Sequence, residues 1–225
     1  IATPMDVWKG TTLTPTDVVT RLAGAANTSR FGVEDMSAAI AQGGGVAATS
    51  GLSFQDFTTA VAATASSFAS GSDAGTSLKT FLIGLTGNSD QAKESIRTLG
   101  LEFFTAQGEM KSMSDIVQQL HDKLGPLSEQ QQTVYLKQIF GNDAFRTAAG
   151  LMKLTGDEFN AMSEKMRKTN SADVAAQRMS NLSGSLEEFL GSLETLAIQF
   201  GAQFLPVLTD VAQVGTDITN AFGAL

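Results

Sequence analysis

Few side chains in this sequence could carry catalytic chemistry, and the single histidine is the first to consider. His121 lies near the end of an expected helix, where it should be solvated or should cap the last carbonyl groups. A Ser-His-Asp triad would have to use this residue, yet no nucleophile elbow such as G-x-S-x-G is present. The chain has no cysteine, which excludes thiol nucleophiles, disulfides and thiolate metal sites.

Carboxylates and glycines are the other candidates for a binding site. The acidic pairs Glu34–Asp35 and Glu187–Glu188 consist of adjacent residues, which point in different directions on a helix and are not expected to share a metal ion. The glycines at 43–45 follow no strand and precede no Lys-Ser/Thr, so they are not a phosphate-binding loop. We expect them to end a helix and allow a sharp reversal. No enzymatic activity, metal or cofactor is predicted.

The overall composition points to close-packed helices. Of the 225 residues, 42% are hydrophobic and only 17% are charged, with 22 glycines and four prolines. The net charge is −8 and no run of Lys or Arg forms a basic stripe, so specific nucleic-acid binding is not expected. No apolar run is long enough for an ordinary transmembrane helix.

Apolar residues recur at helical spacing, which predicts a mainly α fold assembled from short amphipathic helices. Capping-box patterns mark two helix starts, at Ser128 and at Thr155. One small β-hairpin is predicted near residues 101–112, where the turn-like Gln107-Gly108 separates short apolar runs. Because many helices are short and bounded by glycine, we expect an extended set of helices wedged among other proteins.

Three regions are expected along the chain. Residues 1–15 contain two prolines and form an irregular lead-in, and residues 16–170 form a helical core. Residues 171–225 form a coiled-coil and amphipathic segment, in which apolar residues alternate at spacings of 3 and 4. This predicted seam could pack within a helical hairpin of the same chain or mediate self-association around a symmetry axis. Its members are Met179, Leu182, Leu186, Phe189, Leu193, Leu196 and Phe200.

An ordered set of short motifs resembles the core region of phage tail tape measure proteins, of the minor tail protein type. The Ile139-Phe140-Gly141 triplet, followed by Asn-Asp-Ala-Phe-Arg, is its most specific element. The supporting elements are a Gly-Thr-Ser-Leu segment, a Leu-Gly-Leu step and a late F-G-x-x-x-L-P. The residues that carry the resemblance are Gly75, Thr76, Leu78, Gly100, Ile139, Phe140, Gly141, Gly201 and Pro206.

This resemblance implies structural work in a virion tail. Such a protein would occupy the tail tube and tail tip, direct tail assembly and length, and leave with the genome at infection. The implied partners are further copies of itself, as a trimer, together with tail tube proteins, tail-tip or baseplate proteins and tail assembly chaperones. The protein would be made in the host cytoplasm. An alternative role is a membrane-active conduit in the host envelope, suggested by the apolar stretch 186–225.

Overall fold

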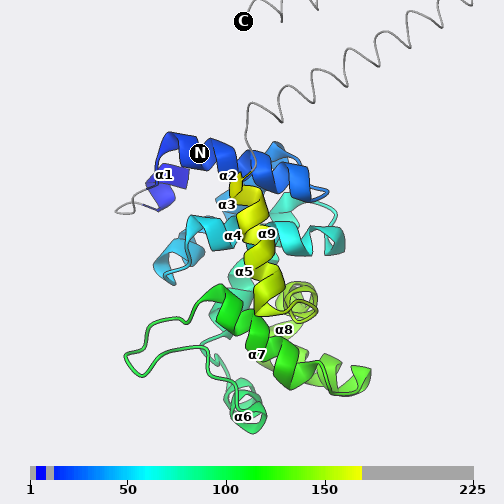
Figure 1. Ribbon diagram of the computed structural model, residues 1–225. Coiled ribbons are helices and arrows are strands. Elements are labelled where there is room, and N and C mark those ends of the chain that lie inside the picture. Colours follow the sequence, from blue (N-terminus) through cyan, green and yellow to red (C-terminus); the bar gives the residue numbers. More distant parts are fainter. Residues whose placement is uncertain (1–3, 9–12, 169–225) are drawn as a thin grey trace, which may run out of the picture. The chain divides into compact units, whose positions relative to one another are not determined.

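The computed structural model describes residues 4–8 and 13–168, and this part of the chain is mainly α-helical (Figure 1). It lies within one structural unit, Ile1–Ser171. None of its helices is long and apolar enough to cross a membrane. The elements are α1 (Pro4–Val7), α2 (Pro15–Thr28), α3 (Val33–Thr49), α4 (Phe54–Thr64), the short 3-10 helix η1 (Ala65–Ser67), α5 (Gly71–Gly84), α6 (Asp90–Leu99), α7 (Met113–Leu124), α8 (Glu129–Leu151) and α9 (Gly156–Lys168).

Hydroxyl side chains define where many of these helices begin. In each case the hydroxyl oxygen accepts a hydrogen bond from the backbone N–H three residues later, which satisfies one unpaired donor of the first turn. The predicted capping boxes at Ser128 and Thr155 are both confirmed, the second by a Thr155 N–H to Glu158 Oε2 bond of 2.8 Å. Such capping residues are Thr14, Ser53, Ser70, Ser89, Ser112, Ser128 and Thr155.

The three consecutive glycines do not end a helix, so that prediction was wrong. Helix α3 runs through residues 43–45 and continues to Thr49. Gly43 and Gly44 are buried while Gly45 is exposed. The helix tolerates them because tertiary packing on two of the three outweighs the low helix propensity of glycine.

A shared apolar core joins helices that are distant in sequence. Helix α5 packs against both α3 and α8, while α9 contacts α2, α4 and α7 (Figure 1). The expectation of an extended set of separate helices was therefore wrong for the described residues, because each short helix buries its apolar face against the others. The largest fully buried side chains are Phe31, Phe57, Phe68, Phe81, Phe159, Met36, Leu78, Met113, Ile116, Leu120, Leu124 and Leu136.

The β-hairpin predicted near residues 101–112 was also wrong. This segment makes only an isolated antiparallel bridge, between Phe104 and Met110, and the described residues contain no strand. The backbone of Glu102 instead pairs with the Gln119 side chain of α7, at 2.7 Å for its N–H and 2.9 Å for its carbonyl oxygen. The hydrogen bonds across the bridge come from Phe103 and Thr105, to Lys111 and Glu109, so the Glu102 groups that Gln119 binds face away from this pairing.

Several expectations fall outside the described residues. All seven residues of the predicted seam, from Met179 to Phe200, lie there, as do Gly201 and Pro206. The predicted coiled coil therefore stays a prediction. Within the expected lead-in, Pro4–Val7 forms one helical turn and Trp8 is buried against the core.

Candidate interaction site

Four family-motif residues of α5 and α8 are buried where α3, α5 and α8 pack together: Gly75, Leu78, Ile139 and Phe140. Thr76 is only partly buried and Gly141 is exposed. Helix α5 contributes Gly75, and its neighbour α3 approaches so closely that a Cβ atom on Gly75 would overlap the Ala39 backbone. A Cβ on Gly43 would lie 2.6 Å from the Gly75 carbonyl oxygen. The two helices therefore touch backbone to backbone, which only small residues permit.

Phe140 of α8 closes the other side of α5. Its ring stacks on Phe81, with centroids 4.7 Å apart and planes inclined by 22°. A Cβ on Gly84 would lie 2.9 Å from Phe140 Cδ1, so this glycine also makes room for the ring. Leu78 and Ile139 are fully buried beside them. These motif residues therefore act as packing residues.

A polar clasp, made of Ser77, Asp143 and Thr147, links α5 to the second half of α8. The Ser77 hydroxyl donates to the Asp143 carbonyl oxygen at 2.7 Å and accepts from the Thr147 hydroxyl at 2.8 Å. Both hydroxyl side chains are buried. The sequence pattern predicts no role for Ser77, although a hydroxyl residue next to the buried Leu78 is a usable signal for such a bond.

Gly141 interrupts α8. Its φ of 76° and ψ of 178° are far from helical values, and helical geometry continues on both sides. Gly100 has a different role and a different place, because it ends α6 with a left-handed φ of 62°. Gly100 contributes nothing to the α3–α5–α8 contact, since a Cβ there would meet nothing within 4 Å.

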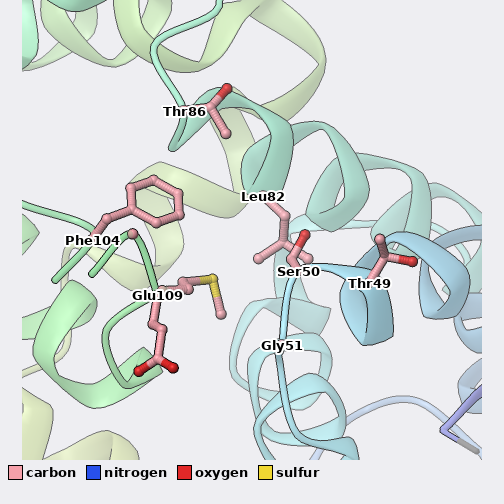
Figure 2. Close-up of a pocket in the computed structure, with 9 residues that line it drawn as sticks. Thr49, Ser50, Gly51, Leu82, Thr86, Phe104 and Glu109 are labelled. Atoms are coloured by element: carbon pink, nitrogen blue, oxygen red, sulfur yellow. The ribbon is translucent and has the colours of Figure 1, made fainter. Parts of the chain in front are cut away.

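An open pocket of about 610 Å³ lies beside this packing centre (Figure 2). Leu82 and the ring of Phe104 supply apolar surface, while Glu109 and Thr86 lie around it. The lining includes hydroxyl groups and one carboxylate but no His, Lys or Arg, so it lacks a nucleophile paired with a strong base. The lining residues are Thr49, Ser50, Gly51, Leu82, Thr86, Phe104, Gly108, Glu109 and Met110.

His121 is held by a contact between helices. Its Nδ1 atom lies 3.2 Å from the carbonyl oxygen of Met152, the residue that ends α8. The expected capping role is therefore found on a neighbouring helix and not on its own. No group of three His, Asp or Glu side chains that could bind a metal ion occurs in residues 4–8 and 13–168.

One carboxylate has an environment that changes its acidity. Partial burial raises the pKa of Asp56 above the ordinary value of 3.8 for an aspartate, while the Ser53 hydroxyl and the positive charge of Arg21 act in the opposite direction. The raised pKa means that ionised Asp56 is less well stabilised in the folded protein than in the unfolded chain.

These features define a helical packing module. Residues 6–141 match the phage-related minor tail protein family, and the chain belongs to this family. It is similar to the tape measure protein of Pneumococcus phage Dp-1, with 24% identity over 208 residues. That match covers 92% of this chain but only 18% of the phage Dp-1 protein. No solved structure matches the chain. The resemblance to phage tail tape measure and minor tail proteins is thereby confirmed.

Proposed function

We propose that this chain is a segment of a tape measure protein, a structural component of a phage or phage-like tail. In this role the protein occupies the tail tube and tail tip, directs tail assembly and length, and is released during genome ejection. The observation that carries the proposal is the family match over residues 6–141, together with the similarity to the Dp-1 tape measure protein.

The chemistry of the chain supports a structural and non-enzymatic role. The net charge of −8 and the absence of a basic stripe are compatible with a protein that occupies the tail tube, through which DNA passes, without binding DNA tightly. The packing centre uses its motif residues for helix contacts, and the open pocket lacks a nucleophile paired with a strong base. A zymogram on cell-wall material should show no clearing, and a cleared band would overturn the non-enzymatic assignment.

Self-association is the part of the proposal that rests on residues 179–200. We expect copies of the chain, three in the simplest arrangement, to pack along the predicted seam, with tail tube proteins, tail-tip proteins and assembly chaperones as further partners. The variant Leu193→Asp places a charge in the seam and should reduce the oligomer measured by light scattering. Thr195→Asp introduces the same charge outside the seam and should leave the oligomer intact. If Leu193→Asp and Thr195→Asp gave the same oligomer size, the predicted seam would not mediate self-association.

Electron microscopy of particles tests the function directly. In-frame deletion of residues 1–225 from the parent gene should abolish tails or change their length. Normal tails on particles that adsorb but deliver no DNA would instead favour the membrane-active alternative, which rests on the apolar stretch 186–225. Dye release from liposomes by the chain would then be the next measurement. Normal, infectious particles would refute both roles for this segment.

A further inference from the structure

The interruption of α8 at Gly141 has an unusual cause. Its combination of φ 76° and ψ 178° lies in a region of backbone conformation that is open almost only to glycine. A Cβ atom at this position would meet nothing within 4 Å. The backbone conformation, and not crowding by neighbours, therefore demands glycine here.

The sequence on both sides of Gly141 is competent to form one unbroken helix. Residues 129–140 and 142–151 are helical in the structure, and neither part contains proline. A continuous helix over these 23 residues would be about 34 Å long. It would also pair the backbone groups that a break leaves without partners inside the helix.

Contacts with other helices hold the bend. Before the bend, the Phe140 ring stacks on Phe81 of α5. After it, Ser77 binds the Asp143 carbonyl oxygen at 2.7 Å. The guanidinium group of Arg146 lies 4.4 Å from the centre of the Phe68 ring and donates to the carbonyl oxygen of Ser67 at 3.2 Å. The bent state is thus stabilised from outside α8.

One contact spans the bend itself. The Lys137 ammonium group lies 5.7 Å from the centre of the Phe145 ring. In a continuous helix these two residues would be separated by about 12 Å along the axis. The bend brings the two side chains together, and this contact weakens when the helix straightens.

From these observations we infer that α8 is a two-state element with Gly141 as its hinge. It is bent while its second half is docked on α5 and η1, and it becomes one straight helix when that contact is released. Because α9 follows α8 directly, straightening pulls α9 away from α2, α4 and α7 and opens the core. The hinge goes beyond the proposed function and does not depend on it, since it concerns the geometry of α8 alone.

Spin-label distance measurements test the hinge, and the absence of native cysteines makes labelling simple. Labels are attached to Gln130→Cys and Ala149→Cys, on either side of Gly141, in the full 225-residue chain. A straight helix places these two Cα atoms about 28 Å apart. We expect one shorter distance in the otherwise unchanged chain, and a major population near the straight-helix value when Gly141→Ala is added, because alanine disfavours positive φ and favours helix.

Gly45→Ala in the same labelled chain is the matched control, because it makes the same chemical change at an exposed helical glycine and should leave the distance unaltered. Retention of the short distance in the Gly141→Ala chain, with helix content unchanged, would overturn the hinge. The Gly141→Ala chain could lose helix content, and the distance would then not test the hinge. In that case the labelled chain without Gly141→Ala is titrated with urea, and its distance distribution is compared with its helix content. A population near 28 Å that appears before helix content falls supports the hinge. Simultaneous loss of the short distance and of helix content refutes it.

Discussion

The three consecutive glycines of α3 provide a sharp test of the packing described above, because their surroundings differ. A Cβ on Gly43 would lie 2.6 Å from the Gly75 carbonyl oxygen and 3.2 Å from a ring carbon of Phe57. A Cβ on Gly44 would lie 3.3 Å from the Trp8 ring, and a Cβ on Gly45 would meet nothing within 4 Å. Identical substitutions at neighbouring positions should therefore change stability in opposite directions.

The magnitudes follow from helix propensity and from steric overlap. Gly45→Ala should raise the free energy of unfolding by about 0.5–1 kcal/mol, because alanine loses less backbone entropy in a helix. Gly43→Ala gains the same propensity but forces α3 away from a backbone oxygen of α5. We expect a net loss of about 1–3 kcal/mol from such overpacking. Gly44→Ala should fall between them, because only side-chain atoms, the edge of the Trp8 ring and the Ile40 Cγ2 methyl group, have to shift.

Thermal unfolding followed by far-UV circular dichroism measures these differences. For a chain of this size, 1 kcal/mol corresponds to a shift in Tm of about 2–4 °C. Trp8 is the only tryptophan, so its fluorescence reports separately on the Gly44→Ala variant. A stabilising Gly43→Ala, or a Gly45→Ala that destabilises by as much as Gly43→Ala, would refute the helix packing described for α3 and α5.

Three further predictions concern polar groups. Ser77→Ala leaves the buried Thr147 hydroxyl without its acceptor and should cost about 1–3 kcal/mol in urea unfolding, whereas Ser77→Thr keeps a hydroxyl and should recover part of that loss if its methyl group fits. Ser128→Ala removes a helix cap and should cost about 1 kcal/mol, and an unchanged urea midpoint would contradict this role. Because the pKa of Asp56 is raised on folding, its ionisation weakens the fold as pH rises above about 3.8. Asp56→Asn should therefore improve stability relative to the original chain more at pH 7 than at pH 3, and an equal difference at both pH values would contradict the raised pKa.

The sequence was sufficient to predict features that depend on neighbouring residues. The mainly α fold follows from helical spacing, and the start of α8 at Ser128 follows from a hydroxyl placed three residues before a glutamine. The ends of α6 and α7 have an equally local basis, because Gly100 and Gly125 follow the last apolar residue of each helix. In each case the deciding interaction spans only a few residues, so local pattern contains the information.

Tertiary structure alone decided the features that depend on distant partners. The glycines at 43–45 remain helical because Gly43 faces Gly75 and Gly44 faces the Trp8 ring, and neither contact is visible in the local sequence. Near residues 101–112 only one bridge forms, and the Glu102 backbone pairs with the side chain of Gln119 on α7, a partner that the local sequence does not reveal. The intrinsic propensity of a glycine or a backbone amide is too weak to determine its conformation or its hydrogen-bond partner. Contacts with distant residues determine both, because burial and hydrogen bonds outweigh propensities of less than about 1 kcal/mol.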